Sequence, residues 1–382
     1  MNIHLFHDDK FNNGAMKQFE RAYPGKNCYI ILLYNQKQLK YTVPNAHTYV
    51  FHIRDLNLLQ QLSGIIQSNS GSRLFLHFID DFKAALVNKL LDKFKHLRFY
   101  WIFYGGDLYE YLTRYEGYQI IDDSSFLPKT SFLNWLSKRT KYLLRFGMSQ
   151  KTAKMRAFQR LDYFCFWNEY DYQLFHSKIK SAAEYKSFIY CNALGDPAHV
   201  QPQKKAVIMI NHAASFSGNH HYIIHTLAKL QIPLTEYQIL LPLSYGDKKF
   251  ADKVKLAAEQ ELKTDINALT KFLPINEYQK ILSEVKIAIF GMRRQEAAGN
   301  VFQLLNMGAQ VFLRKDNTLL HWLKKRDFIV FCIEEDELEL SRLNGLTLEQ
   351  MSHNRIQYER YFNSQIYDNM MQQLIIDTRK SN

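Results

Sequence analysis

The sequence predicts an α/β protein made of two Rossmann-like domains that face each other across a cleft. Two observations support this prediction. In the first third of the chain, short aliphatic and aromatic runs alternate with polar, helix-compatible stretches, which is the pattern of a parallel sheet with crossover helices. The same alternation begins again near residue 205. Two successive α/β layers form a double Rossmann-like arrangement with a cleft between them.

The elements of the first domain, residues 1–190, follow from this alternation. Short apolar runs such as Tyr29–Tyr34 predict strands, and the stretches between them are compatible with helices. We expect strands near residues 2–6, 28–34, 48–53, 73–79 and 97–103, and helices near residues 14–22, 56–66, 80–94 and 107–115.

The second domain, residues 205–346, begins after a connection rich in turn formers at residues 190–204. After it, residues 347–382 carry a long helical pattern, which we expect to form a C-terminal helix that packs back across both domains. Within the domain we expect strands near 205–210, 237–241, 285–290, 310–313 and 328–332, and helices near 219–230, 248–262, 275–283, 297–307 and 317–324.

One segment of the first domain, residues 124–161, contains nine lysines and arginines but no aspartate or glutamate. Aromatic and aliphatic residues lie between these cations. On helices, this composition gives an apolar stripe edged by positive charge, which suits a helix lying on an anionic membrane surface. A stripe that faces the protein core, with a solvated basic face, is the alternative.

Composition limits the class of protein. At 382 residues and 47% hydrophobic, the chain can bury two ordinary cores and is neither disordered nor fibrous. The four cysteines lie far apart without a CxxC pair, so neither a disulfide framework nor a zinc cluster is indicated. We expect no cofactor and no metal.

The net charge of +12 favours an anionic partner, which would be nucleic acid, a lipid surface or a phosphorylated substrate. The amino terminus lacks the basic region of a secretory signal. The apolar runs are much shorter than the roughly 20 residues that span a bilayer. We therefore expect a cytoplasmic protein.

The densest group of candidate site residues is Trp101–Glu110, where a strand runs into a glycine pair and an acidic helix start. Glycine lets the backbone approach a ligand, and ligands of open α/β sheets bind at the carboxyl ends of strands. Asp107 either faces that ligand or only caps the helix. His77, late in the preceding strand, either deprotonates an acceptor hydroxyl or is structural. The candidate catalytic residues are Asp107, His77 and Glu110, and the candidate acceptor contacts are Gly105, Gly106 and Tyr109.

In the second domain, a strand ending at Phe290 leads into a loop with two arginines and then a helix start. A helix amino terminus attracts phosphate through its N–H groups, and adjacent arginines add charge-assisted hydrogen bonds. The motif predicts a diphosphate cradle, with two surface arginines on an ordinary turn as the alternative. Neither a Walker P-loop nor GxGxxG is present, which argues against P-loop NTPases and typical dinucleotide dehydrogenases. The candidate donor-binding residues here are Arg293, Arg294, Gln295, Glu296, Gly299 and Asn300.

Two further turns of the second domain contribute candidates for donor binding. Their small polar side chains can contact phosphate, sugar, base or ribose, although each stretch is equally an ordinary turn. Four histidines near the first turn lack a carboxylate or cysteine to complete a zinc site, so we expect packing or surface roles for them. The donor candidates are Asn211, Ser215, Ser217, Asn219, Ser244, Tyr245 and Gly246, and the histidines are His212, His220, His221 and His225.

Four motifs, taken in order, resemble the TDP-N-acetylfucosamine:lipid II N-acetylfucosaminyltransferase family, the 4-alpha-L-fucosyltransferase-like glycosyltransferase family 56. The motifs are Tyr104–Glu110, Asn211–His221, Leu241–Gly246 and Arg294–Asn300. The resemblance covers roughly residues 70–335. The chain departs from the family at Gly106, where the family tends to have alanine, and its amino-terminal third and basic segment match poorly.

The resemblance implies a GT-B fold and metal-independent transfer of 4-acetamido-4,6-dideoxygalactose from thymidine diphosphate to a polyprenyl-diphosphate-linked saccharide. The reaction would take place at the inner face of the bacterial inner membrane. Helix dipoles and cations usually neutralise the leaving diphosphate in GT-B enzymes, a role that fits Arg293, Arg294 and the helix opening near Asn300. A fucose-type transfer in O-antigen or capsule assembly is an equal alternative.

Two other classes stay open on the sequence alone. The net charge, 24 tyrosines and 27 phenylalanines also suit a nucleic-acid-binding protein. No RRM, KH, zinc-finger or convincing helix-turn-helix signature is present, so we expect no nucleic-acid partner. A nucleotide-sugar epimerase on the same two-domain plan would isomerise the donor without an acceptor.

Overall fold

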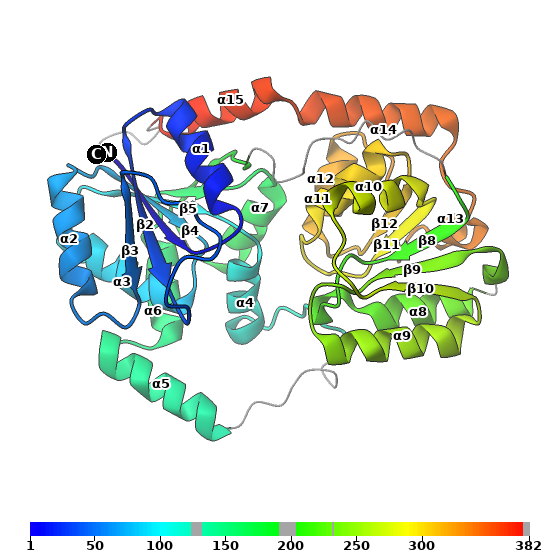
Figure 1. The fold of residues 1–382 in the computed structure, drawn as a ribbon, viewed down its shortest axis with the longest axis horizontal. Helices are drawn as coiled ribbons and strands as arrows, with labels where there is room; N and C mark the ends of the chain where they lie inside the picture. Colours follow the sequence, from blue (N-terminus) through cyan, green and yellow to red (C-terminus); the bar gives the residue numbers. More distant parts are fainter. Residues whose placement is uncertain (124–131, 191–203, 231–232, 377–382) are drawn as a thin grey trace. The chain divides into compact units, whose positions relative to one another are not determined.

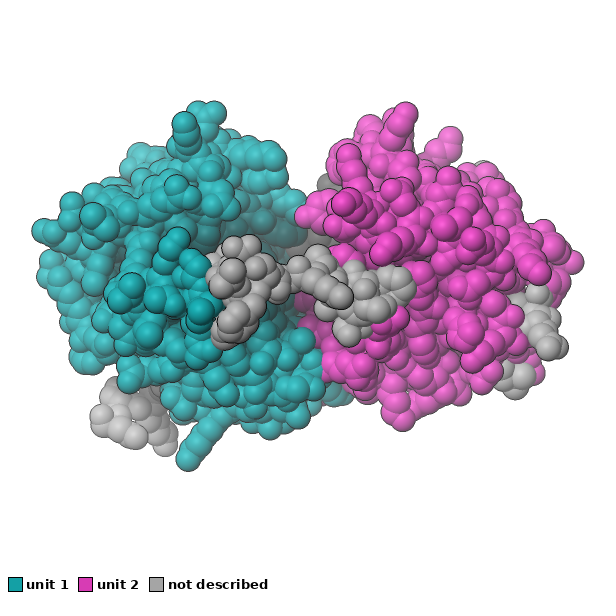
Figure 2. Space-filling view, turned by 90° about the horizontal axis from the view of Figure 1, so that it is seen from below, with its two compact units in different colours: residues 1–118, 129–193, 364–382 teal, residues 119–128, 194–363 magenta. Residues whose placement is uncertain are grey.

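The computed structural model describes residues 1–123, 132–190, 204–230 and 233–376. The chain forms two compact units, coloured teal and magenta in Figure 2. Unit 1 contains residues 1–118, 129–193 and 364–382, and unit 2 contains residues 119–128 and 194–363. Most of the predicted connection at 190–204 and the start of the basic segment lie outside the described residues.

Unit 1 is built on a sheet of parallel strands (Figure 1). The strands are β1 (Asn2–His7), β2 (Asn27–Leu33), β3 (Thr48–His52), β4 (Arg73–His77), β5 (Arg98–Ile102), β6 (Tyr163–Cys165) and β7 (Glu184–Lys186). The helices are α1 (Asn12–Ala22), α2 (Leu58–Ser68), α3 (Asp81–Lys93), α4 (Gly106–Tyr115), α5 (Phe132–Phe146), α6 (Gln150–Gln159), α7 (Glu169–Lys178) and α15 (Ser364–Leu374). The order across the sheet is β3-β2-β1-β4-β5-β6-β7. It reverses between β1 and β4, so their carboxyl ends form the topological switch point, where such sheets bind ligands.

The central strands of unit 1 are continuous apolar runs because both faces of the sheet are covered. All seven residues of β2 are buried, as expected for a parallel strand between helix layers. The expected strands and helices of the first 120 residues are all present. The sequence pattern does not predict β6 and β7, because strands of three residues are too short to show a period.

Unit 2 is a second parallel sheet. Its strands are β8 (Val207–Ile210), β9 (Gln238–Pro242), β10 (Asp265–Leu269), β11 (Ile287–Phe290), β12 (Gln310–Leu313) and β13 (Phe331–Cys332). Its helices are α8 (His220–Lys229), α9 (Lys248–Leu262), α10 (Ile275–Glu284), α11 (Ala298–Asn306), α12 (Thr318–Lys325), α13 (Glu337–Arg342) and α14 (Leu348–Tyr361), with 3-10 turns η2 (Phe216–Gly218) and η3 (Leu234–Glu236). The order is β10-β9-β8-β11-β12-β13, so the switch point lies between β8 and β11. Figure 1 shows α8 and α9 on one face of the sheet and α10, α11 and α12 on the other.

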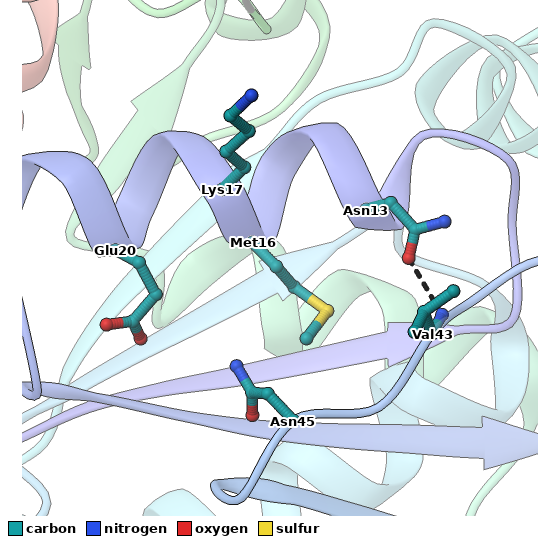
Figure 3. A pocket seen from close by; sticks show the side chains of 6 residues that line it. All are labelled: Asn13, Met16, Lys17, Glu20, Val43 and Asn45. Carbon is teal, nitrogen blue, oxygen red and sulfur yellow. Dashed lines mark hydrogen bonds between the residues drawn. The ribbon is translucent and has the colours of Figure 1, made fainter.

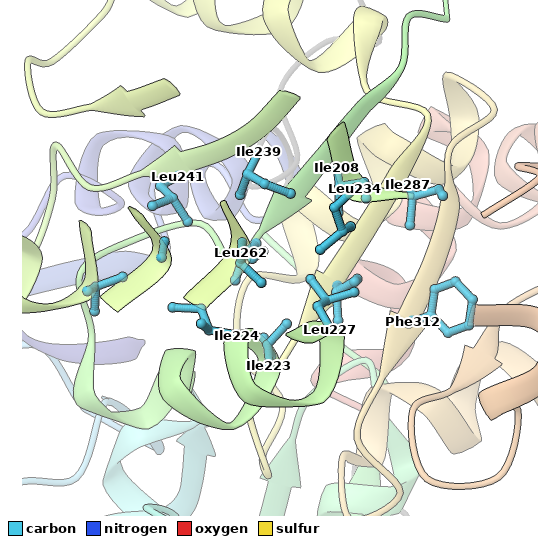
Figure 4. Packing of buried hydrophobic residues seen from close by; sticks show 14 of the residues in the cluster. Ile208, Ile223, Ile224, Leu227, Leu234, Ile239, Leu241, Leu262, Ile287 and Phe312 are labelled. Carbon is cyan, nitrogen blue, oxygen red and sulfur yellow. The ribbon is translucent and has the colours of Figure 1, made fainter. Parts of the chain in front are cut away.

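The core of unit 2 lies between this sheet and helices α8 and α9 (Figure 4). Ile208, Ile239 and Ile287 come from three adjacent strands and are fully buried, in one cluster with Ile223 and Leu227 of α8. Burying one such side chain contributes roughly 1.5–3 kcal/mol. This packing fixes the positions of β8 and β11, and therefore of the loops that leave their carboxyl ends.

The predicted C-terminal helix is two helices in the structure. In unit 2, α14 packs on α11, and Thr347 and Gln350 form a capping box at its start. In unit 1, α15 packs on α1, and beyond it Lys186 Nζ donates to the carbonyl of Ile376 at 2.7 Å. That the segment packs back across both domains stays a prediction.

Unit 1 also has a hollow of about 400 Å³ beside α1 (Figure 3). Residues of α1 and of the loop before β3 line it, and Asn13 Oδ1 accepts a hydrogen bond from the Val43 N–H at 2.8 Å. The lining residues are Asn13, Met16, Lys17, Glu20, Val43 and Asn45. None of the predicted site residues is among them, so the hollow plays no part in the site below.

Candidate functional site

The loops that follow β8 and β11 are tied together at the switch point of unit 2. Asn211, the first residue after β8, is fully buried. Its Oδ1 accepts from the backbone N–H of Gly291 and its Nδ2 donates to the carbonyl of Gly218, both at 2.9 Å. Asn211 has a left-handed backbone (φ 57°), which asparagine adopts more readily than most residues. The predicted donor-side turn therefore begins at a rigid cross-tie.

Glycine is required on both sides of this turn because the backbones touch. A Cβ atom on Gly291 would lie 2.3 Å from the carbonyl oxygen of Gly218. A Cβ atom on Gly246, which has φ +115°, would lie 2.2 Å from the carbonyl oxygen of Ala214. The Ala214 N–H donates to the carbonyl of Tyr245 at 2.7 Å. The loops after β8, β9 and β11 thus form one packed edge.

Asn219 ties a short stretch of chain, residues 119–123, to the same edge. We call this stretch the strap. Asn219 Nδ2 donates to the carbonyls of Gly291 at 2.9 Å and of Ile120 at 3.1 Å. Its Oδ1 accepts from the N–H of Asp122 at 2.9 Å. The predicted donor residue Asn219 therefore holds two loops and the strap in one arrangement.

Three predicted donor residues gather around the carboxylate of a fourth, Glu296. The Ser217 hydroxyl donates to it at 2.7 Å, the Arg294 guanidinium pairs with it at 2.9 Å, and the Ser215 hydroxyl lies 2.6 Å from that of Ser217. Burial alone would raise the pKa of Glu296. The charges of Arg294 and His212 and the Ser217 hydrogen bond outweigh burial and lower that pKa, so Glu296 is ionised at neutral pH.

Two arginines lie at the ends of β11 and β12. Arg293, in the loop after β11, pairs with Asp316 and Asp122. Arg314, the first residue after β12, pairs with Asp122 and Glu334. Arg314 was not among the predicted donor residues. Its position directly after a buried strand was the available signal, because the carboxyl ends of parallel strands share one edge.

The amino terminus of α11 faces the same loop. Ala297 occupies its N-cap with a left-handed backbone and has no side chain that can accept a hydrogen bond. The first N–H groups of the helix, which include those of Gly299 and Asn300, therefore lack a side-chain cap. The Asn300 side chain accepts from the Tyr278 hydroxyl at 2.8 Å, and Gln295 is buried before the helix. In the loop after β9, Ser244 and Tyr245 are exposed.

In unit 1, Asp107 lies in the core and forms hydrogen bonds within the protein. It is fully buried, and its Oδ2 accepts from Trp101 Nε1 at 2.7 Å and from the N–H of Ile79 at 3.0 Å. Burial raises the pKa of its carboxyl. The expectation that Asp107 caps the helix is wrong, because Gly105 holds the N-cap of α4 with φ 103°, a conformation that favours glycine.

The other predicted residues of this turn point in different directions. Tyr109 is fully buried and its hydroxyl donates to Asp171 at 2.6 Å. Glu110 keeps 38% of its side chain exposed and pairs with Lys154 at 3.0 Å and Arg114 at 2.6 Å. Of the three predicted catalytic residues, only Glu110 presents its side chain at the surface, because His77 is also fully buried.

His77 lies on β4 next to β5, as expected, and belongs to a chain of hydrogen bonds. Asn27 sets the donor-to-acceptor direction of this chain. The Asn27 Nδ2 donates to backbone carbonyls at the end of α1, and the Asn27 Oδ1 can only accept. His4 Nε2 therefore donates to Asn27 Oδ1 (3.4 Å), and His4 Nδ1 accepts from His77 Nε2 (3.1 Å). His77 Nδ1 then accepts from the Tyr190 hydroxyl, which accepts from the Tyr104 hydroxyl at 3.0 Å.

Three residues at the switch point of unit 1, Lys83, Phe78 and His7, were not among the predicted site residues. Lys83 is fully buried, and its Nζ donates to the carbonyl of His77 at 2.7 Å and to His7 Nδ1 at 3.1 Å. Phe78 has φ 65°, an outlier for a bulky residue, and its ring contacts those of His7 and Tyr104. Backbone strain of this kind gathers at functional sites. Sequence carries no signal for it.

In the described part of the basic segment, α5 exposes one side, whereas Lys154 and Phe158 of α6 are buried. Leu144 is 82% exposed and Leu136 and Leu143 are also exposed, whereas Phe146 is buried and the Tyr142 hydroxyl donates to the carbonyl of Asp81 at 2.6 Å. These leucines do not face the core. Among the described residues, no helix has both the length and the apolar content needed to cross a membrane.

Comparison with solved structures shows the fold class. The chain is similar to the N-terminal domain of Candida albicans trehalose-6-phosphate phosphatase (TM-score 0.65, 10% identity, 98% of this chain and 95% of that chain). It is also similar to sucrose-phosphate synthase from Thermosynechococcus elongatus (0.63, 10%, 98% and 98%) and to a UDP-forming alpha,alpha-trehalose-phosphate synthase from Burkholderia vietnamiensis (0.60, 7%, 98% and 99%). The predicted GT-B fold is confirmed. No curated protein matches the sequence.

The family follows from a match along the sequence. The model of the family "4-alpha-L-fucosyltransferase glycosyl transferase group 56" matches residues 166–378, more than half of the chain. The chain therefore belongs to this glycosyltransferase family, and the predicted resemblance is confirmed. The matched residues include all the donor-side motifs of unit 2, whereas the Tyr104–Glu110 motif lies outside them.

Proposed function

We propose that this glycosyltransferase moves a fucose-type or deoxy-amino sugar from a nucleoside diphosphate, with thymidine diphosphate favoured, to a lipid-linked saccharide in bacterial surface polysaccharide synthesis. The supporting observation is the cross-tie between Asn211 and Gly291, which builds a rigid edge at the switch point of unit 2. Sheets with this strand order bind nucleotides at that point. The proposal assigns the donor to unit 2.

The proposed reaction needs positive groups around the leaving diphosphate. The acceptor hydroxyl gives its proton to a base and attacks the anomeric carbon, the bond from that carbon to the diphosphate oxygen breaks, and the nucleoside diphosphate leaves. Guanidinium groups and helix N–H groups stabilise such developing charge. Arg293, Arg294 and the uncapped first turn of α11 are the groups that we assign to this role. We propose that they serve without a metal ion.

We propose that unit 1 contacts the acceptor at its own switch point. The hydrogen-bond chain directs the Tyr104 proton toward Tyr190, so the remaining lone pairs of the Tyr104 oxygen can accept a hydrogen bond from a sugar hydroxyl. His77 then acts through Tyr190 as a positioning residue. Asp107 holds the turn before α3, and we assign the role of base to Glu110, the predicted catalytic residue whose carboxylate reaches the surface.

We propose that α5 holds unit 1 on an anionic membrane surface, which would be the inner face of the bacterial inner membrane. Its exposed leucines lie beside Arg139 and Lys141, which are exposed as well. A groove of about 380 Å³ next to α5, which includes Leu56 and Leu59 at its rim and Arg145 and Lys89 at its edge, extends the apolar surface. Apolar area edged by cations is the composition of an interfacial helix.

The first experiment is the thermal stability of the protein with TDP, UDP and GDP. A ligand at a hundredfold excess over its Kd stabilises the folded state by about 2.7 kcal/mol. We expect a selective rise of Tm with TDP, followed by sugar transfer from a TDP-sugar to a polyprenyl-diphosphate-linked saccharide. Selective binding of UDP or GDP would change the donor, and no shift with any of them would contradict the proposal. Isomerisation of the donor without acceptor would identify an epimerase.

A further inference from the structure

Each of the two arginines at the edge of unit 2 is held in place by an acid of the same edge. Arg293 Nε donates to Asp316 at 2.8 Å. Arg314 Nε donates to Glu334. Asp316 follows β12 and Glu334 follows β13, so both acids are fixed to the sheet. The two guanidinium groups therefore have set orientations.

The Nη1 groups of both arginines converge on one further carboxylate, that of Asp122. Arg293 Nη1 lies 3.3 Å from Oδ1, and Arg314 Nη1 lies 2.7 Å from Oδ2. Arg314 is only 9% exposed, and its guanidinium lies 3.8 Å from the centroid of the Tyr222 ring. Two N–H donors aimed at two oxygens of one anion is a geometry that arginines use for carboxylate and phosphate alike.

Asp122 differs from the other two acids because it is not part of the sheet edge. It lies on the strap, between α4 and α5, and follows no strand of the unit 2 sheet. The strap is attached by the Asn219 side chain, which bonds Ile120 and the N–H of Asp122. The Asp122 carboxylate can contact solvent, because 27% of its side chain is exposed. Because Asp316 and Glu334 follow strands of the sheet and Asp122 does not, we take Asp122 to be the acid that leaves the arginines.

We propose that the Asp122 carboxylate holds the place of a phosphate group, and that the diphosphate of the donor displaces the strap from Arg293 and Arg314. The inference rests on the proposed function, because it takes the donor site to be in unit 2. It adds Arg314 to the donor-binding residues. It also makes the strap a competitor of the ligand, because one pair of arginine Nη1 groups cannot satisfy both anions.

Calorimetric titration of the full chain with inorganic pyrophosphate at low salt tests the competition. Asp122→Asn removes the competing charge and should tighten binding by about fivefold. Arg314→Gln removes one of the two donors and should weaken binding by about tenfold. Asp123→Asn removes the same charge from the next strap residue and should leave the Kd unchanged. An Asp122→Asn variant that binds pyrophosphate no more tightly than the unmodified protein overturns the proposal.

A second measurement needs no variant and therefore does not depend on how a substitution folds. Hydrogen exchange at the Asp122 amide, which donates to Asn219, should become faster when pyrophosphate saturates the unmodified protein. Unchanged or slower exchange overturns the proposal. If the protein transfers sugar but shows neither the change in Kd nor the faster exchange, the proposed function stands and displacement of the strap is rejected. If both effects occur but no sugar is transferred, displacement of the strap by pyrophosphate stands and the proposed function is rejected.

Discussion

His77 Nε2 lies 3.1 Å from His4 Nδ1, and both rings are fully buried in unit 1. The His77 ring stacks on Phe6, and the His4 ring stacks on Phe75. Burial lowers the pKa of His4 to about 3 and holds the pKa of His77 well below its ordinary value. Both rings are therefore neutral near pH 7. Protonation of either one would place an unpaired charge in the core.

This pair predicts that the protein loses stability in mild acid. The folded-state pKa of each histidine is lowered, so below about pH 6.5 the unfolded chain binds protons that the folded chain does not. Each histidine should then remove roughly 1.4 kcal/mol from the free energy of unfolding per pH unit. Urea unfolding from about pH 7.5 to about pH 5 measures this slope.

Two variants separate these histidines from other titrating groups. His77→Gln should remove about one proton from the number taken up on unfolding, and should therefore reduce the slope of the free energy of unfolding against pH. His225→Gln, at a side chain that is 61% exposed, is the surface control. A free energy of unfolding that does not depend on pH in this range would show that the rings are not neutral and buried in solution.

Gly291→Ala should disrupt the donor edge. Its Cβ would lie 2.3 Å from a backbone oxygen, so the loops after β8 and β11 must separate, at a cost of about 1–3 kcal/mol. We expect a lower Tm and weaker binding of nucleoside diphosphate. Gly64→Ala is the matched control, because a Cβ there meets nothing within 4 Å in helix α2 and should stabilise by about 0.5–1 kcal/mol. If Gly291→Ala binds nucleoside diphosphate with unchanged affinity, the donor site does not lie at this edge.

Glu110→Gln and Asp107→Asn should differ in what they change. If Glu110 is the base, its loss lowers kcat by about 10²- to 10⁴-fold, and the loss of its ion pair with the buried Lys154 also lowers Tm. Asp107→Asn weakens the buried hydrogen bonds to Trp101 and Ile79 and should cost about 1–3 kcal/mol of stability. Steady-state kinetics and thermal unfolding of both variants test this. A larger loss of kcat in Asp107→Asn, at an unchanged Tm, would reverse the assignment.

Charge reversal on α5 should weaken membrane association. Arg139→Glu with Lys141→Glu removes two exposed cations, each worth about 1 kcal/mol at an anionic surface. Co-sedimentation with liposomes that contain anionic lipid measures the loss. Lys249→Glu with Lys255→Glu on α9 changes the net charge equally and should bind nearly as well as the unmodified protein. Equal partition of all three proteins would reject docking through α5.

The sequence predicts most of the fold because its apolar runs form strands and the polar stretches between those runs form turns. The polar edge strand β10, with Asp265 and Asn267, lacks that signal, as do the three-residue strands β6 and β7. The break between α14 and α15 is also hidden, because both helices carry similar apolar spacing. Each of these elements depends on tertiary packing more than on local pattern.

The candidate site was less accessible to sequence reasoning. Motifs at strand ends predicted Asn211 and Glu296 as site residues, since parallel strands bring their carboxyl ends to one edge. Side-chain direction could not be read in the same way. Asp107 points into the core instead of toward a ligand, and Arg314 acquires its significance from Asp122, nearly 200 positions earlier in the chain. Such pairings exist only once the sheet has formed.

The order in which the chain is synthesised gives α15 a particular consequence. Met371 and Leu374 complete a buried cluster of unit 1 that includes Phe19 and Phe75, yet all of residues 194–363, in unit 2, are translated first. On the ribosome, the unit that emerges first is therefore the one that is finished last. Until α15 arrives, this cluster is left partly uncovered, which makes the nascent chain a natural client for chaperones.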